Sequence, residues 1–129
     1  MQRNHRAKRI DTGKWIEGWY SSYSDFRGNG YYQIRSDNGY QNDVDFTTVC
    51  QYIGFLDREE NRVYENDIVE FIYSPKTLNE KVIGKVCLDD WGNWVIDNGK
   101  ALYHIKKVAE GLVIGNIYDN PDLLSGSEV

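Results

Sequence analysis

The chain has 129 residues, the length of one ordinary domain that can bury roughly two-thirds of its extended surface. A hydrophobic content of 40% and an aromatic content of 14% exclude a disordered chain, and 27% charged residues suit a soluble one. The net charge of -5 argues against a protein that binds polyanions over its whole surface. No apolar run approaches the roughly 20 residues needed to cross a bilayer, and the start lacks the apolar stretch of a secretion signal. We therefore expect a cytoplasmic protein with no membrane contact.

The first half of the chain has the pattern of short paired strands. Thr12 and Gly13 form a turn signal between two runs of high β propensity, which predicts a hairpin. The strands predicted in this half are residues 7–10, 15–20, 31–35 and 46–52. The dipeptide Asn-Gly favours the positive φ angles of tight turns, and it occurs three times, at residues 29–30, 38–39 and 98–99.

The second half predicts five short strands separated by turn residues. A five-strand set of this size suggests a small barrel, because closure removes exposed strand edges. The predicted strands are residues 67–73, 82–88, 94–97, 101–105 and 112–117. A short helical turn should follow, with Asn120 as its cap and Pro121 at its first position. We expect one mainly β domain, in which a charged turn joins a strand segment (1–56) to the barrel (63–124), with a loose tail (125–129).

The N-terminus is basic although the rest of the chain is acidic. Arg3, Arg6, Lys8 and Arg9 place four cations and no acid in the first nine residues. One interpretation is a solvated, partly frayed terminus. The other is a short arm that touches an acidic partner such as a nucleic acid.

The residues that carry chemistry are sparse. Cys50 and Cys87 lack the spacing of a zinc site or a disulfide framework, and a Cys87–His104 dyad is only weakly motivated. Three aspartates near the turn at Trp91 lack the alternating ligand pattern of a calcium loop, and they are Asp89, Asp90 and Asp97. We therefore expect no catalytic residues, no metal site and no cofactor.

An aromatic group in the second half is the most suggestive surface feature. It consists of Trp91, Trp94, Tyr103 and Tyr118. Small barrels bind partners through aromatic side chains in loops and adjoining strands. With 4 Trp and 10 Tyr in the chain, some rings should lie on the surface and others in the core. A partner-binding surface and a core role both stay open at this point.

Three stretches of the chain carry a family resemblance. They are residues 6–15, residues 48–57 leading into 63–69, and residues 113–124. Together they resemble the YopX family of phage and prophage proteins over nearly the whole length. The chain departs mildly from the family pattern at Ile53, Phe55, Asn61 and Asn66. Asparagine replaces glycine well where the backbone needs positive φ, so the turns at Asn61 and Asn66 should be preserved.

The resemblance implies an SH3-like barrel in the second half but no mechanism, because the function of the family is uncharacterised. The motif residues have a structural explanation in turns, bends and close backbone approach. Glu65 and Asp67 can cap the turn that enters the first barrel strand. The motif residues are Gln51, Tyr52, Gly54, Tyr64, Glu65, Asp67, Gly115, Asn116, Tyr118, Asn120 and Pro121.

Three classes of function remain as hypotheses. The first is a non-enzymatic phage or prophage protein that binds a host or phage protein. The second is a nucleic-acid binder that uses the basic arm and stacking aromatic rings. The third, a hydrolytic enzyme, would need titratable residues that converge in a pocket. Self-association is a further hypothesis, because short strand edges invite pairing.

Overall fold

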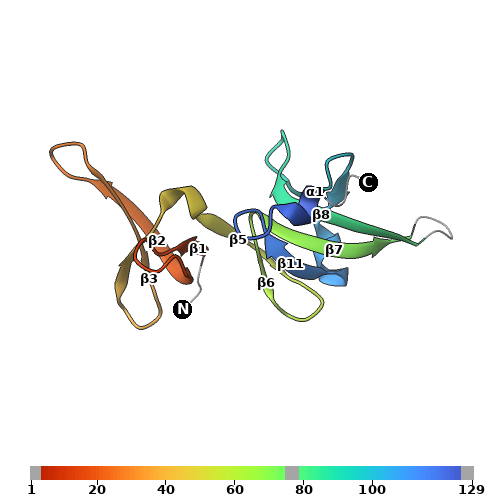
Figure 1. The fold of residues 1–129 in the computed structure, drawn as a ribbon, viewed down its shortest axis with the longest axis horizontal. Coiled ribbons are helices and arrows are strands. Elements are labelled where there is room, and N and C mark those ends of the chain that lie inside the picture. The colour runs from red at the N-terminus through yellow and green to blue at the C-terminus, as the bar shows by residue number, and fades with distance from the viewer. Residues whose placement is uncertain (1–3, 75–78, 126–129) are drawn as a thin grey trace. The chain divides into compact units, whose positions relative to one another are not determined.

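The computed structural model describes residues 4–74 and 79–125. The chain divides into two compact units, Met1–Tyr52 and Ile53–Val129. Each unit is built on antiparallel strands (Figure 1), which confirms the prediction of a mainly β protein. No helix among the described residues is long and apolar enough to span a membrane.

The first unit is built on an antiparallel sheet. Its elements are β1 (His5–Lys8), β2 (Trp15–Ser24), β3 (Gly30–Arg35), β4 (Gln41–Asp43), the 3-10 helix η1 (Phe46–Thr48) and the start of β5 (Cys50–Leu56). The strand order is β4-β3-β2-β1-β5, and β6 (Arg62–Tyr64) follows β5 in the same sheet. Ala7, Ile34 and Val44 form a small, fully buried core on one face.

The hairpin predicted around Thr12 and Gly13 is confirmed, because β1 pairs with β2 from His5 opposite Gly18 to Lys8 opposite Trp15. The expectation of a loose terminus is wrong from His5 onward. There β1 pairs with β2 on one side and β5 on the other, so its cations lie on an ordered inner strand.

The strand predicted for residues 46–52 begins too early. Asp45 accepts a hydrogen bond from the Thr47 N–H at 3.0 Å, and residues 46–48 turn as η1 instead of extending. Aspartate before a helical turn satisfies an N–H group that would otherwise have no partner, which outweighs the β propensity of Phe46 and Thr47. The extended strand starts at Cys50.

The second unit contains the five predicted strands, all confirmed within two residues of their expected ends. They are β7 (Asp67–Tyr73), β8 (Glu80–Leu88), β9 (Trp94–Asp97), β10 (Leu102–His104) and β11 (Leu112–Asn116). The 3-10 helix η2 (Ile105–Glu110) precedes β11, and the expected helical turn is α1 (Asp122–Ser125). The order is β10-β9-β8-β7-β11, so β10 and β11 are its two edges and the described strands form no closed barrel.

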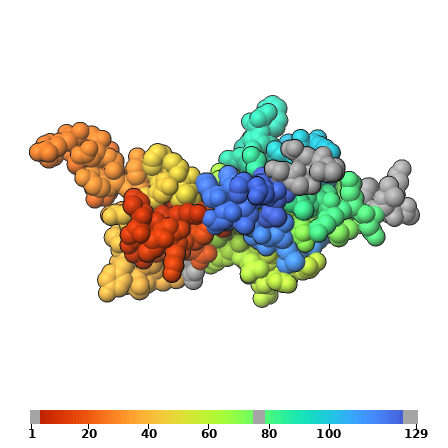
Figure 2. All heavy atoms as spheres, in the orientation of Figure 1, coloured from red at the N-terminus to blue at the C-terminus, as the bar shows by residue number. Residues whose placement is uncertain are grey.

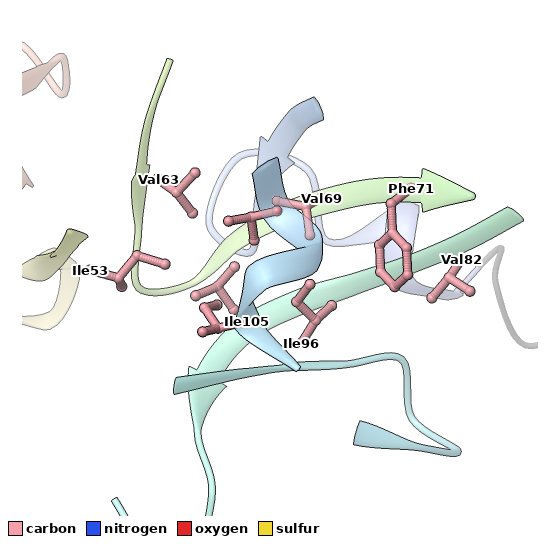
Figure 3. Packing of buried hydrophobic residues seen from close by; sticks show 9 residues of the cluster. Ile53, Val63, Val69, Phe71, Val82, Ile96 and Ile105 are labelled. Atoms are coloured by element: carbon pink, nitrogen blue, oxygen red, sulfur yellow. The ribbon is translucent and has the colours of Figure 1, made fainter. Parts of the chain in front are cut away.

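The core of the second unit lies between the sheet and η2 (Figure 3). Ile105 and Val108 of η2 pack onto side chains that point inward from β7, β8 and β9. The buried set is Ile53, Val63, Val69, Phe71, Val82, Val86, Ile96, Ile105 and Val108. Alternate residues of β7 and β8 supply this face, as the period of two expected for half-buried strands requires.

Three turns, residues 25–29, 57–61 and 89–93, share one construction. In each, the first residue is an aspartate whose Oδ1 accepts the N–H groups two and four residues later at 2.8–3.0 Å. The aspartate N–H donates to the carbonyl of the asparagine that ends the turn. The fourth residue has positive φ, and it is Gly28 (84°), Glu60 (66°) or Gly92 (81°).

This construction corrects one predicted turn. Gly39 and Gly99 have positive φ, as their Asn-Gly dipeptides predicted. Gly30, in contrast, is the first residue of β3, and Gly28 supplies the positive φ of that hairpin. The Asp25 carboxylate fixes the turn two residues earlier than the dipeptide suggests.

The turn at residues 57–61 is also attached to β11. Oδ2 of Asp57 accepts the Val113 N–H at 3.0 Å, and the Arg58 N–H donates to the Gly111 carbonyl at 2.8 Å. Burial raises the pKa of Asp57, but hydrogen bonds from Val113 and Asn61 outweigh it and hold the pKa below its ordinary value. Asp57 is only 5% exposed, so its carboxylate is an internal link between the turn and the sheet.

Replacing Glu60 with glycine should raise the free energy of unfolding by about 0.5–1 kcal/mol. Left-handed backbone costs an L-residue roughly 1–2 kcal/mol, and glycine removes this cost. Glycine also makes the unfolded chain more flexible, which offsets part of the stabilisation. Urea unfolding measures the change. The matched control is Glu59→Gly, which lies outside the positive-φ position and should destabilise the protein. The same direction of shift in both variants would contradict the strain explanation.

Replacing Asp57 with asparagine should lower the free energy of unfolding at neutral pH by about 1.5–3 kcal/mol, the range for hydrogen bonds to a charged group. A carboxyl with a lowered pKa stabilises the fold above its ordinary pKa and loses this effect as pH falls through the folded value. The difference between the two proteins should therefore shrink below about pH 4.

Unfolding curves at several pH values test this expectation, with the exposed Asp90→Asn as the control that should change little. A difference between wild type and Asp57→Asn that stays constant down to low pH would show that the charge of Asp57 is not what stabilises the turn.

Candidate partner-binding surfaces

The four aromatic residues considered for a partner surface do not form one cluster. Trp91 is 88% exposed in the turn at residues 89–93. Trp94 and Tyr103 are half-buried and pack against the core, and the Tyr103 ring lies edge-on to Phe71 at 5.3 Å. The Tyr118 hydroxyl accepts a hydrogen bond from the Asn66 side chain at 3.0 Å. Of the four, only Trp91 leaves nearly its whole side chain exposed to solvent.

The family-motif residues near the end of the chain hold local structure. The Asn116 side chain accepts the Tyr118 and Asp119 N–H groups at 3.0 and 2.9 Å. Oδ1 of Asn120 accepts the Asn116 N–H, and a Cβ on Gly115 would overlap with this side chain. These contacts hold the turn that follows β11.

The motif residues that precede β7 also form a turn. Asp67 accepts the Tyr64 N–H at 2.8 Å, and Asn66 between them has a φ of 69°, as expected for an asparagine that replaces glycine. Gly54 in β5 has a φ of 88°. The backbone at these motif positions therefore turns or bends where the sequence suggests it.

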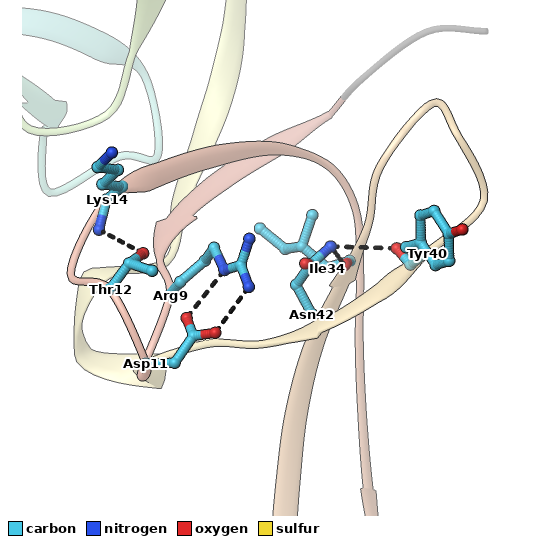
Figure 4. A network of polar contacts seen from close by, with 7 residues as sticks. All are labelled: Arg9, Asp11, Thr12, Lys14, Ile34, Tyr40 and Asn42. Atoms are coloured by element: carbon cyan, nitrogen blue, oxygen red, sulfur yellow. Dashed lines mark hydrogen bonds and ion pairs between the residues drawn. The ribbon is translucent and has the colours of Figure 1, made fainter.

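The basic residues near the N-terminus lie on the sheet of the first unit. The Arg6 guanidinium lies 4.6 Å and the Lys8 ammonium 5.4 Å from the centre of the Trp15 ring. Arg9 instead holds the Asp11 carboxylate with two hydrogen bonds of 2.9 and 2.7 Å (Figure 4). Arg3 lies outside the described residues. A hollow of about 660 Å³ borders Arg6 and Trp15.

The residues considered for catalysis or metal binding do not meet. Val95 lies between Cys87 and His104 in one row across β8, β9 and β10, so two strand spacings of about 4.8 Å separate the pair. Burial raises the pKa of the Cys87 thiol. The His104 ring accepts the Lys106 N–H at 3.1 Å and so caps η2. Among the described residues, no three His, Cys, Asp or Glu side chains gather as metal ligands.

The main feature missed by the sequence analysis is the ribbon formed by β2 and β3 (residues 19–35). Its turn projects beyond the rest of the first unit, as the orange segment in Figures 1 and 2 shows. The Tyr23 and Tyr31 rings stack across the two strands with centres 4.9 Å apart. Phe26 in the turn is 92% exposed, and the Arg27 guanidinium lies over its ring at 5.3 Å.

Phe26 and Trp91 therefore lie in turns of the same construction, Phe26 as the second residue of its turn and Trp91 as the third. Each is a large ring in a turn headed by an aspartate, and each is almost fully exposed. The third turn of this kind carries Arg58 and Glu59 instead and is attached to β11. The shared pattern of Asp, then Gly three residues later and Asn after it, is the sequence signal that could have located both rings.

Comparison with known proteins agrees with this two-unit β fold. The crystal structure of protein EF1440 from Enterococcus faecalis is similar, with a TM-score of 0.60 over 96% of this chain and 99% of that one. The sequence identity of 19% supports likeness in fold alone. Comparison with curated proteins gives no match. Residues 4–125 match the family described as YopX protein, and the chain therefore belongs to the YopX family.

Proposed function

We propose that the chain is a non-catalytic protein-binding module that presents Phe26 and Trp91 as anchors for partner proteins. The observation that carries this proposal is the exposure of both rings, 92% and 88%, in turns of the same rigid construction. When a partner covers an exposed apolar ring, the removal of that surface from water contributes to the free energy of binding.

The turn geometry favours binding at both rings. A buried aromatic side chain removes about 150–250 Å² from water, and aromatic residues are enriched among those that dominate binding energy. The Asp25 and Asp89 carboxylates each accept two backbone N–H groups and hold their turns in one shape. A partner therefore has little loop entropy to remove when it covers the ring.

The charge around each ring indicates a different partner surface. Trp91 lies beside Asp89 and Asp90 in a half of the chain, residues 53–129, with fourteen acidic and eight basic residues. A partner with a basic rim around an apolar pocket would complement it. Phe26 has Arg27 beside it in a half with seven basic and six acidic residues, so its partner surface needs no strong charge.

The setting of this function is also a proposal. Membership of the YopX family supports an origin in a phage or prophage and a partner from the host or the phage, met in the bacterial cytoplasm. We propose that the second unit is an SH3-like barrel left open at one seam. The pairing of β11, the last strand of this unit, with β7 supports this description.

A second candidate function, binding to a single-stranded nucleic acid, rests on one face of the first sheet. Register places Lys8 beside Trp15 and Arg35 beside Trp19, and both tryptophans lie on the same face of β2. Aromatic rings flanked by cations can stack bases and hold the phosphate backbone.

Removal of either anchor ring should weaken capture of partner proteins from host cytoplasm. Truncation of a residue that dominates binding costs about 2 kcal/mol or more, a loss of at least about thirtyfold in affinity. Crosslinking followed by mass spectrometry would compare wild type with Phe26→Ala and Trp91→Ala. The matched control is Tyr40→Ala, because Tyr40 is also exposed (71%) but lies in a different turn. The proposal fails if all proteins that wild type enriches are retained by both anchor variants.

The nucleic-acid candidate predicts binding that weakens with salt. Fluorescence anisotropy with a labelled single-stranded oligonucleotide would measure the binding constant at several salt concentrations. The slope of its logarithm against the logarithm of the salt concentration should decrease in magnitude by about 0.7 for each phosphate contact removed. Lys8→Gln and Arg35→Gln should each flatten the slope, and Lys106→Gln in the second unit should leave it unchanged. Wild-type binding with no salt dependence would exclude this function.

A further inference from the structure

We propose that the outer edge of β2, residues 19–24, pairs antiparallel with the same edge of a second copy of this chain. The two ribbons then form one continuous four-stranded sheet. This surface is a strand edge, distinct from the turn tips that carry Phe26 and Trp91, so the proposal goes beyond the binding function above.

Among residues 4–74 and 79–125, the strand pairing leaves this edge open. β1 covers β2 only from Trp15 to Gly18. Within the described part of the chain, residues 19–24 pair with β3 alone. The N–H and C=O groups on the outer side of such a strand are a ready template for another strand.

The edge has the composition of a strand inside a sheet. Natural edge strands are protected by Lys, Pro, a bulge or a very short length. Residues 19–24 read Trp-Tyr-Ser-Ser-Tyr-Ser and contain no charge, no proline and no glycine. The other edges differ, because β4, β6 and β10 have three residues each and β11 carries a register shift between Val113 and Gly115.

Charge favours a second copy as the occupant. The chain carries -5 overall, but the acidic excess lies in residues 53–129. The ribbon contains only Asp25, Arg27 and Arg35 as charged residues, and hydrogen bonds from Asn29 lower the pKa of Asp25 and use its carboxylate within the turn. Residues 19–24 themselves carry no charge, so two copies of this edge can approach without repulsion between like charges on the paired strands.

Symmetry then fixes the residues that meet. Antiparallel pairing of one edge with itself requires a two-fold axis perpendicular to the sheet, so opposite residues share a face. With Ser21 on the axis, Trp19 lies opposite Tyr23 of the second copy on both sides. Such cross-strand aromatic pairs contribute roughly 0.2–1 kcal/mol each, and the small Ser21 side chains permit close approach at the centre.

Sedimentation of the full chain over a range of concentrations tests the proposal. Wild type should dimerise, and Ser21→Lys should weaken the dimer at least about tenfold, because it places two like charges opposite each other. Gln33→Lys is the matched control, since Gln33 faces Ser21 within the ribbon but lies on β3, and it should leave the dimer intact. A mixture of Ser21→Lys and Ser21→Glu chains should restore the dimer.

A second measurement covers the case in which the charged variants fail to fold. Ser21→Cys should form a disulfide-linked dimer on oxidation, because residues paired on the axis have Cα atoms about 4.5–5.5 Å apart, within disulfide range. Gln33→Cys should not.

Three results would overturn the proposal. They are a monomeric wild type at all concentrations, equal effects of Ser21→Lys and Gln33→Lys, and no crosslink through residue 21. Phe26→Ala and Trp91→Ala should leave the dimer intact, so loss of partner capture and loss of self-association can be told apart.

Discussion

An aspartate carboxylate that accepts the backbone N–H groups two and four residues later is the interaction on which most of this structure depends. It closes the hairpins β2–β3, β5–β6 and β8–β9, and each time it holds the fourth residue of the turn in left-handed backbone. The bonds are charge-assisted and local, so they form without help from a large core. Among the described residues, the apolar cluster of the first unit contains three fully buried side chains. Local bonds of this kind matter most where the core is small.

The same turn serves two different purposes in the chain. At residues 57–61 the aspartate has a second task, because Asp57 also accepts the Val113 N–H and so attaches the turn to the sheet. At residues 25–29 the aspartate accepts a hydrogen bond from Tyr31 of the same hairpin, and at residues 89–93 it accepts N–H groups of its own turn. Each of these two turns carries a large ring that is exposed to solvent. A rigid turn that is free of packing is the natural place for residues selected for binding rather than for stability.

The strands of the second unit could be predicted from the sequence because β-branched and aromatic runs there alternate with clear turn residues, as in the segment 82–88. The segment 46–52 shows the limit, since its β propensity is overruled by one hydrogen bond from Thr47 to Asp45. The order of β1 as an inner strand could not be predicted, because it depends on long-range pairing with β5. The exposed Phe26 was missed because the Asn29-Gly30 dipeptide predicts the turn at residues 29–30, whereas hydrogen bonds to Asp25 place the positive φ at Gly28.

The strand β5 has a consequence for how this protein can be divided. It starts in Met1–Tyr52, where Cys50 and Gln51 pair with β1, and it ends in Ile53–Val129, where Ile53 belongs to the buried core. A fragment cut at the boundary would break one strand into two pieces, each too short to pair well. A gene segment exchanged by recombination, or a fragment made for expression, would therefore have to include residues 50–56 intact. The two units are for this reason expected to be inherited together.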